Sequence, residues 1–552
     1  MQVDLKKIKA HYEALKSERQ SSWDPHWKDI AEHFLPRGHK FLCTTGGRNT
    51  GYKRNQRILD DTGTKAARTS AAGFISHLAS PSKPWFRLQP PNPKDLENFG
   101  ARQWLDDSVS RMLKVLGGSN AYTVLGHAFL DLLLFGTACP IYEEDDEDVL
   151  RLYHAPIGSY VLANDSRGRP QIFAHEYART ARQLMDTYPD TVPELVRTAA
   201  KNSPEQWFDC IQYISPNKQH DAQNPLSKRY VSVRYVSTCK DDDPPLKVSG
   251  FDSFPVLATR WTTYGEDVYG TSPGMDALPL VRRLQKIQEK TLKAIDKMVD
   301  PAMLVSPGMD GRNNDFNTPG SQIATADPAA EGAKPAHVPN LPIHHAQALI
   351  EDLRKQVFDT LYANLFLMFA TDDRSNVTAQ EIRARLEEKY LSLAPVVERF
   401  DAELLRPLID RLFVSMAQRG MFEKPPASLA GKNLTIRYLS VLSTAQQATG
   451  LGSMDRLLMM VQAVAPMKPD VLDKIDFDQM IDEVADATSL PPRIIRSDDD
   501  VAGIREARQQ MEQQMAQATA ANENAKAAAS LSRVDMNQNT AAKQLIEDGS
   551  EE

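Results

Sequence analysis

The amino-acid sequence predicts an α+β fold that is predominantly helical. Apolar residues recur at helical spacing along most of the chain, whereas short β-rich runs are concentrated between Leu150 and Arg260. The 41% of hydrophobic and 25% of charged residues are typical of a globular protein rather than of a disordered or membrane chain. At 552 residues the chain has room for several substructures, because roughly 100 to 200 residues make one domain.

The N-terminal part is predicted to be mainly helical. Apolar side chains at helical spacing cover residues 4–35, with one interruption by proline, and return in residues 61–78 and 101–135. A strand is expected at residues 85–88, directly after a breaker rich in Ser and Pro. The most apolar run, residues 129–141, is shorter than the roughly 20 residues that span a bilayer. We therefore expect a buried element there and no membrane partner.

The centre of the sequence predicts two long amphipathic helices. The first starts after Pro279 and ends before Pro301, with apolar residues from Leu280 to Val299 on one face. The second covers residues 343–369 in the same register. The residues between the two helices are rich in Pro, Gly, Asn and Ala and are too many for an ordinary connector. They predict a small module or a loop.

Further helices are predicted beyond this pair. Residues 371–376 are polar and predict a break, after which the capping box of residues 378–381 starts another long helix. Pro395 and Pro407 predict that this helix is bent or segmented. Shorter helices are expected within residues 454–496. The last fifty or so residues have few apolar positions and predict a frayed helix or disorder.

A cationic stripe is the sharpest candidate site. Six cations recur at spacings that place them along one edge of the first long helix: Arg282, Arg283, Lys286, Lys290, Lys293 and Lys297. One interpretation is a solvated face, which Glu289, Asp296 and Asp300 partly neutralise through helical side-chain pairs. The other is a surface that faces phosphate groups. If identical helices lined a ring, such contacts would be weak, would read no bases and would permit sliding.

Cysteine spacing and net charge restrict the classes of site. The four cysteines, Cys43, Cys139, Cys210 and Cys239, lie far apart without a C-x-x-C pair, so neither a zinc site nor a disulfide framework is indicated. A formal net charge of -8 argues against tight wrapping of nucleic acid, which depends on Lys and Arg displacing counterions. Weak or sliding contact with DNA is compatible with this charge.

Catalysis has no positive support in the sequence. Residues 46–51 have the glycine spacing of a phosphate loop, but Tyr52 stands before Lys53, where the motif requires Lys directly after the glycine. The acidic run from Glu143 to Asp148 leaves a metal-dependent nuclease as an alternative, since carboxylates bind hard cations. Two-metal nucleases, however, need carboxylates that converge from separate elements. We predict no catalytic residue, no cofactor and no metal site.

Several segments, in their order along the chain, resemble the head-to-tail connecting proteins of short-tailed phages. The N-terminal signature comprises residues 54–64, Ala72 with Gly73, and residues 80–88. Further landmarks follow in the order of that family: residues 135–138, 156–160, 255 with 260–261, 269–270, 272–274, 378–382, 395–397, 403–405, 407–409 and 440–447. The resemblance covers residues 5–450 and not the extreme C-terminus.

This resemblance implies a portal fold that assembles as a closed ring of twelve subunits at one capsid vertex. Portal subunits have a wing of mixed α+β structure, a stem of two helices, a clip inserted between those helices, and a helical crown. The implied boundaries are a wing at 1–271, stem helices at 272–300 and 343–369, a clip at 301–342, a channel loop at 370–377, a long bent wing helix with a following strand at 378–440, a crown at 441–500 and a tail at 501–552.

The resemblance also implies a function and partners. The ring would be part of the virion, assembled in the host cytoplasm, and would conduct double-stranded DNA during packaging and ejection. It would contact the terminase large subunit, tail adaptor proteins, and the major capsid and scaffolding proteins. The clip residues at the terminase or adaptor contact would be Asp310, Arg312, Asn313 and Asn314. The channel loop would contain Thr371, Asp372, Asp373, Arg374, Ser375 and Asn376. A tail adaptor or scaffold that conducts no DNA is the second alternative.

Overall fold

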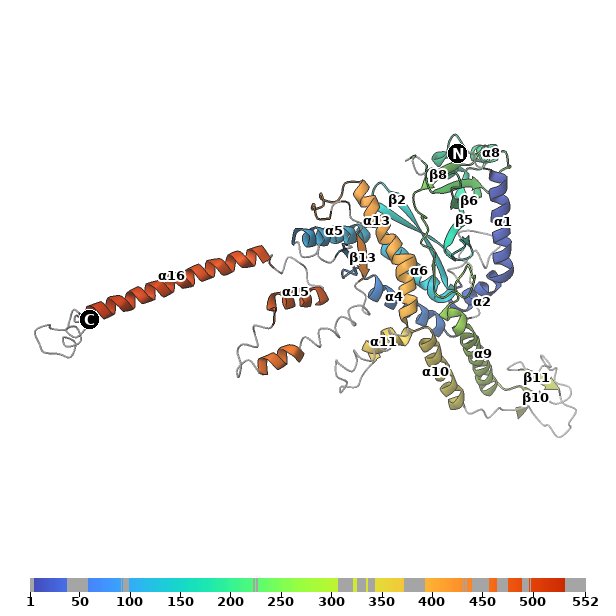
Figure 1. The fold of residues 1–552 in the computed structure, drawn as a ribbon. Helices are drawn as coiled ribbons and strands as arrows, with labels where there is room; N and C mark the ends of the chain where they lie inside the picture. The colour runs from blue at the N-terminus through green and yellow to red at the C-terminus, as the bar shows by residue number, and fades with distance from the viewer. Residues whose placement is uncertain are drawn as a thin grey trace, which may run out of the picture. The chain divides into compact units, whose positions relative to one another are not determined.

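The computed structural model describes most of the chain and confirms a mixed fold in which helices predominate (Figure 1). The described residues are 4–36, 58–90, 92, 99–221, 224, 227–305, 321–324, 334–335, 343–371, 393–429, 431, 434–438, 456–463, 475–488, 496 and 498–531. The chain divides into two compact units, residues 1–91 with 107–450 and residues 92–106 with 451–552.

The first unit contains most of the helices. They are α1 (Leu5–Ser22), α2 (Asp24–Phe34), α4 (Thr62–Leu78), α6 (Ala121–Phe135), α7 (Ala181–Thr187), α8 (Glu194–Asn202), α9 (Pro273–Val299), α10 (Ile343–Thr360), α11 (Ala363–Thr371) and α13 (Arg406–Gln418). Helix α5 (Phe99–Gly118) begins in the second unit and ends in the first. The predicted interruption near residue 25 is confirmed, because Pro25 occupies the first turn of α2, where a missing N–H costs nothing.

The described strands of the first unit form four small sheets. The largest has five antiparallel strands in the order β4-β5-β6-β7-β8, and the others have the orders β3-β2-β9, β11-β10-β12 and β1-β13. The bounds are β1 (Phe86–Gln89), β2 (Thr137–Asp145), β3 (Val149–Ala155), β4 (Tyr160–Asn164), β5 (Pro170–Thr180), β6 (Trp207–Pro216), β7 (Tyr230–Val236), β8 (Lys247–Phe251), β9 (Thr259–Arg260), β10 (Met303–Val305), β11 (Gln322–Ala324), β12 (Lys334–Pro335) and β13 (Thr435–Tyr438).

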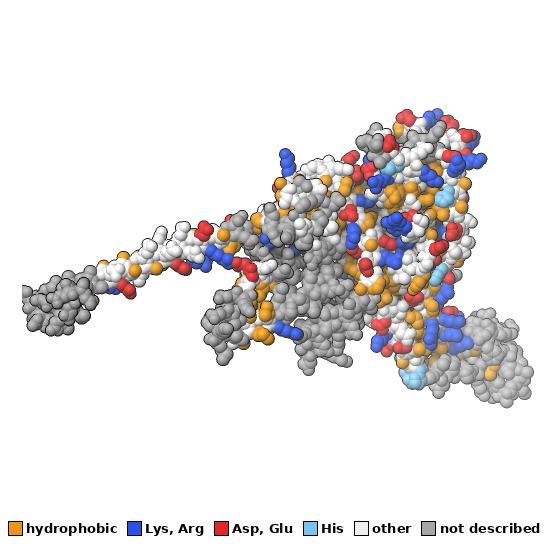
Figure 2. Space-filling model, viewed as in Figure 1, with side chains coloured by type: hydrophobic (Ala, Val, Ile, Leu, Met, Phe, Trp, Pro, Cys, Tyr) orange, Lys and Arg blue, Asp and Glu red, His pale blue; other side chains and the backbone are white. Residues whose placement is uncertain are grey.

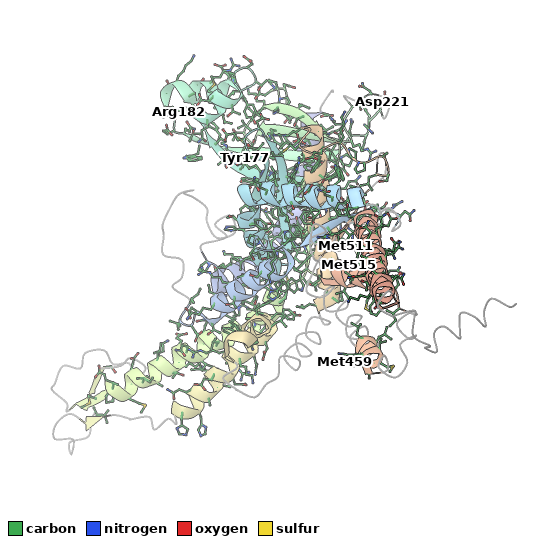
Figure 3. All side chains as sticks on the ribbon, turned by 90° about the vertical axis from the view of Figure 1, so that its left-hand side faces the viewer. Tyr177, Arg182, Asp221, Met459, Met511 and Met515 are labelled. Atoms are coloured by element: carbon green, nitrogen blue, oxygen red, sulfur yellow. The ribbon has the colours of Figure 1, made fainter. Side chains whose placement is uncertain are left out.

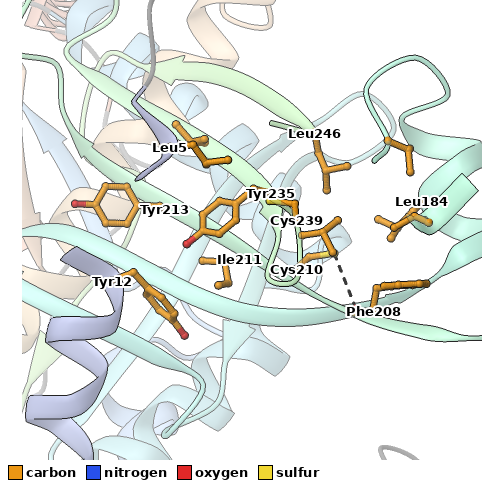
Figure 4. Close-up of a cluster of buried hydrophobic side chains, with 14 of the residues drawn as sticks. Leu5, Tyr12, Leu184, Phe208, Cys210, Ile211, Tyr213, Tyr235, Cys239 and Leu246 are labelled. Atoms are coloured by element: carbon orange, nitrogen blue, oxygen red, sulfur yellow. Dashed lines mark hydrogen bonds between the residues drawn. The ribbon is translucent and has the colours of Figure 1, made fainter. Parts of the chain in front are cut away.

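The central strands of the five-stranded sheet bury side chains on both faces. Successive side chains of a strand point to opposite faces, and Ala174 of β5 joins the core cluster that Leu5 and Tyr12 of α1 cover (Figure 4). The neighbouring Phe173 and His175 are also buried and make ring contacts outside that cluster. The contact of His175 with Tyr153 brings β3 to this second face. The β-rich stretch of the sequence therefore forms the middle of a layered core.

A buried helix connects this layer to the long helices. Helix α6 is followed by Gly136 at φ 78°, a left-handed cap that glycine adopts without strain. A Cβ at this position would collide with the backbone of Gly270. The chain then turns directly into β2, so the apolar run of residues 129–141 is a buried helix end and strand, as the sequence predicts.

Two helices run side by side away from the five-stranded sheet (Figure 1). They are α9 and α10, which we name the stem pair. The described residues between them form the three short strands β10, β11 and β12, of which β10 pairs with both others. The described residues here thus form short paired strands, and the choice between a module and a loop stays a prediction.

Two boundaries of these helices differ from the sequence prediction. The apolar pattern places the start of α9 after Pro279, whereas the resemblance implies residue 272. The helix starts at Pro273, because the Ser272 side chain caps Met275 N and Pro279 is accommodated inside the helix. The second long helix is not continuous over residues 343–369. Tyr362 adopts φ 61°, which ends α10 and starts the separate helix α11. Residues 393–418, in turn, form one continuous helix, with a π-helical segment at Asp401–Leu405 directly before Pro407.

The second unit contains helices with many exposed apolar side chains. It includes a short helix at residues 456–463, α15 (Phe477–Thr488) and α16 (Asp498–Leu531). Met511 and Met515 are exposed on α16, and Met459 is exposed on the short helix (Figure 3). From residue 501 the sequence predicts a frayed helix or disorder; of these alternatives, residues 501–531 are helical and continue one helix of 34 residues.

Candidate nucleic-acid interface

The base of the stem pair is fixed to helix α6. Ser272 has two roles there: its hydroxyl accepts a hydrogen bond from Met275 N at 3.2 Å and donates one to the Leu134 carbonyl at 2.7 Å. Gly274 lies so close to the backbone of Leu134 that a Cβ would overlap with it. Helix α9 therefore starts at a defined point of the buried core.

The two helices of the stem pair bury their shared face only near that base. Leu284 of α9 packs with Ile350 and Leu353 of α10 in one apolar cluster. Farther along α9, Leu292 is 45% exposed and Val299 is 79% exposed. The distal half of the stem pair thus has apolar side chains that this copy of the chain leaves uncovered.

The six cations predicted as a stripe lie on the outer side of α9. All are exposed except Lys297, which is half-buried. At about 100° per residue they occupy an arc of about 100°, centred about 180° from the buried residues Ala277, Val281 and Leu284. The spacing in the sequence therefore corresponds to a surface, and Lys and Arg side chains are gathered over α9 (Figure 2).

Acidic neighbours neutralise this surface only in part. Arg282 pairs with Asp29 of α2 at 2.6 Å, and Lys293 pairs with Glu289 at 2.7 Å. The Lys293 side chain holds the pKa of Glu289 below its usual value. Within the part of the chain that the structure describes, Lys286 and Lys290 make no ion pair. A net positive arc thus remains, and phosphate groups are the ligand class that it suits.

The other predicted contact residues, apart from Thr371, lie outside the described residues. Thr371 ends α11, and the remaining channel-loop residues, from Asp372 to Asn376, are not described. The same holds for the four predicted clip residues, Asp310, Arg312, Asn313 and Asn314.

The acidic run from Glu143 to Asp148 forms the end of a β-hairpin. Its carboxylates have separate structural partners. Glu143 pairs with Arg234 at 2.8 Å, while Asp145 accepts hydrogen bonds from the backbone of Glu147 and Asp148 within the turn. Among the described residues, no group of three or more His, Cys, Asp or Glu side chains is arranged to hold a metal ion. The geometry of this run supports a hairpin turn and not a nuclease centre.

A polar joint at the base of the stem pair is absent from the sequence prediction of the site. We name it the stem joint; it consists of Leu59, Asp60, Gln285 and Arg354. The Gln285 amide of α9 accepts hydrogen bonds from Leu59 N and Asp60 N and donates one to the Asp60 carbonyl, at 2.7–2.9 Å. Arg354 of α10 donates two hydrogen bonds to one Asp60 carboxylate oxygen, at 3.0 and 2.7 Å.

The Asp60 carboxylate is held in its charged form. Burial alone raises the pKa of Asp60, but hydrogen bonds from Thr62 and Arg354 outweigh this effect and leave the pKa below the usual value. Asp60 lies within residues 54–64, which belong to the segments that resemble the phage family. This resemblance is the feature of the sequence that points to Asp60. Gln285 is a polar residue on the buried side of α9. In the sequence it appears only as an interruption of the apolar pattern, which does not indicate a polar joint.

Comparison with known proteins identifies the family. Residues 5–495 match the model of the bacteriophage head to tail connecting protein family. A probable portal protein of Bordetella phage BPP-1 is 35% identical over 549 residues, covering 98% of this chain and 97% of that protein. The portal protein of Salmonella phage epsilon15 is 36% identical over 520 residues, covering 93% of each chain.

Comparison with solved structures also finds gene transfer agent particles. The neck of an empty particle aligns with a TM-score of 0.29 and 10% identity, over 72% of this chain and 90% of that chain. At this score the family assignment depends on the sequence relatives instead. None of the described helices is long and apolar enough to span a membrane. From the family match over residues 5–495 and the two relatives aligned along nearly their whole lengths, this chain belongs to the bacteriophage head to tail connecting protein family.

Proposed function

We infer that the chain is a portal protein of a bacteriophage virion, and we propose that twelve copies close into a ring that conducts double-stranded DNA. The portal proteins among its relatives support the function. The single structural observation that supports conduction is the stem pair, which presents a cationic arc on the side of α9 opposite its buried face. Repeated around an axis, this arc would give a ring of weak phosphate contacts.

Closure into a ring is supported by the uncovered apolar side chains of the stem pair. In a head-to-tail assembly one patch of a subunit meets a different patch of the next, and such contacts form a ring when the rotation closes. The exposed Leu292 and Val299 of α9 and Leu349 of α10 suit burial against a neighbouring stem pair. The net charge of -8 suits a channel that must release its cargo, because a negative surface discourages lasting contact with phosphate.

Partner contacts are assigned by position in the proposed ring. The clip, residues 301–342, would meet the terminase large subunit during packaging and tail adaptor proteins afterwards, through Asp310, Arg312, Asn313 and Asn314. The channel loop, residues 370–377, would approach the DNA. Major capsid and scaffolding proteins would contact the wing, and assembly would take place in the host cytoplasm before the ring becomes part of the virion.

Neutralising the cationic arc tests conduction separately from assembly. Replacing Lys286, Lys290, Lys293 and Lys297 with Gln removes four positive charges per subunit and leaves the buried face of α9 unchanged. We expect normal rings but a change of about twofold or more in the fraction of particles that retain a full genome, because phosphate contacts contribute additively to affinity. Ring assembly is measured by electron microscopy and genome content by quantifying encapsidated DNA.

The matched control carries the same change of charge elsewhere. The exposed residues Lys6, Lys114, Lys201 and Lys218 are replaced with Gln in one variant, which should package and retain DNA like the wild type. Equal behaviour of both variants and the wild type would reduce the arc to a solubility feature. A wild-type particle with no open channel would instead favour a non-conducting adaptor or scaffold.

A further inference from the structure

We propose that the stem joint sets the position of both stem helices, so that Asp60, Gln285 and Arg354 are positioning residues of the DNA channel. This inference rests on the proposed function, because it concerns the part of the chain that we assign to the channel wall. The three side chains belong to three separate parts of the sequence, and the joint is the place where polar contacts connect all three.

The hydrogen bonds of the Gln285 amide fix the register of α9 at this joint. One side-chain amide satisfies two backbone N–H groups and one carbonyl of the segment that precedes α4. Moving α9 by one residue would rotate Gln285 by about 100° and break all three hydrogen bonds. Buried backbone groups left without partners are costly, so the amide defines both the rotation and the height of α9 at this level.

The Asp60–Arg354 pair fixes the second helix to the same point. The Asp60 side chain is 2% exposed, whereas the Arg354 side chain is 46% exposed. The guanidinium therefore reaches inward from the surface of α10 to a carboxylate that has little access to water. Removing Arg354 would leave that carboxylate buried without its countercharge, which is unfavourable. The pair thus restrains α10 relative to the same short segment that Gln285 holds.

Helix α4 continues this attachment along α10 and α11. The Ser70 hydroxyl donates a hydrogen bond to the Leu361 carbonyl at 2.6 Å, at the level where α10 ends. One turn farther, Gly73 lies directly against the ring of Phe366 in α11, where a Cβ would overlap with that ring. Asp60, Ser70 and Gly73 therefore contact α10 and α11 at successive levels, so that α4 and the segment before it hold both helices in place.

The helix is interrupted between α10 and α11, so contacts with α4 are needed to hold these two helices in place. Tyr362 has φ 61°, a left-handed conformation that is unfavourable for a residue other than glycine. Its ring stacks on Trp261 with centroids 6.0 Å apart, which adds a further restraint. Because the distal half of the stem pair buries little surface, its position depends on what is fixed at the base. The stem joint supplies that restraint.

Hydrogen exchange of the assembled protein tests the inference. Asp60→Asn and Arg354→Gln each break the ion pair, and we expect exchange in residues 290–299 and 344–352 to become about tenfold faster. Asp61→Asn and Lys355→Gln are matched controls, because both residues are exposed neighbours outside the joint; they should exchange like the wild type. The double variant should exchange no faster than the faster single variant, since the two residues form one interaction.

The results that would overturn the inference are distinct from a failure of the proposed function. Faster exchange throughout the chain, or equal exchange in Asp60→Asn and Asp61→Asn, would show that Asp60 is a general stability residue or has no effect. If Asp60→Asn fails to fold, Arg354→Lys retains the charge while losing the two-nitrogen fork, and it should give an intermediate increase confined to the same residues. Absence of rings in the wild type would contradict the proposed function, yet the same exchange comparison on the unassembled chain would still test the joint.

Discussion

At the residue scale, the buried His175 is a titratable group whose protonation the fold opposes. Its ring lies among Phe173, Tyr177 and Tyr153 on the second face of the five-stranded sheet. Burial, with a smaller effect from the nearby guanidinium groups of Arg234 and Arg179, lowers the pKa of His175 from 6.5 to about 3. None of these three neighbours is acidic, so none of them could form an ion pair with a protonated His175 ring.

This lowered pKa gives a pH dependence of known sign. Below pH 6.5 the unfolded chain binds a proton at His175, while the folded chain does not until about pH 3. The free energy of unfolding should therefore fall as the pH falls through this window, by at most about 1.4 kcal/mol per pH unit from this residue. His175→Phe should flatten the slope measured by urea unfolding between pH 4 and 7, and His345→Phe, at an exposed position, should not. An unchanged slope in His175→Phe would contradict the assignment.

The cations of α9 were predictable from the sequence, whereas the residues of the stem joint were not. The six cations of α9 form a surface because their spacing alone fixes the helical edge on which they lie. The stem joint was not predictable in this way. Gln285 and Arg354 are separated from Asp60 by more than two hundred residues along the chain, and no local pattern shows that three such segments meet.

At the element scale, α4 should be sensitive to a single added methyl group. Gly73→Ala would place a Cβ in the Phe366 ring, so we expect a loss of about 1–3 kcal/mol in the free energy of unfolding, as is usual for overpacking. Gly117→Ala in α5 meets no atom within 4 Å and should stabilise by up to about 1 kcal/mol through helix propensity. Both values come from denaturant unfolding. A neutral or stabilising Gly73→Ala would show that α11 is not seated against α4 as described.

The differences between the predicted and the observed helices have physical causes. The start of α9 was predicted too late because a proline inside a helix is unfavourable, yet Pro279 lies inside α9, whose first turn is capped by Ser272 and whose buried face already includes Ala277. Tyr362 carries no sequence signal of a left-handed residue, since glycine or asparagine is the usual indication. Helix α16 has sparse apolar positions, so the sequence leaves a frayed helix and disorder as alternatives there, and its Ala, Gln, Glu and Arg residues favour a helix intrinsically.

At the scale of the whole molecule, the mixed α+β class and the order of its parts were predictable from the sequence. The β-rich stretch forms the five-stranded sheet, and the two amphipathic patterns form the stem pair. The distribution of uncovered apolar side chains was not predictable, because it depends on which surfaces one copy of the chain leaves free. Leu292 and Val299 belong to the same apolar pattern as the buried Leu284, yet only the structure separates them.

The central claim is that copies of this chain surround an axis with the cationic arc of α9 directed inward. Cryo-electron microscopy of the purified, assembled chain tests this claim most directly. The expected result is a closed ring with an open channel in which Lys286 and Lys290 of every copy line the wall. A monomer under assembly conditions, or a ring in which these lysines point away from the axis, would contradict it.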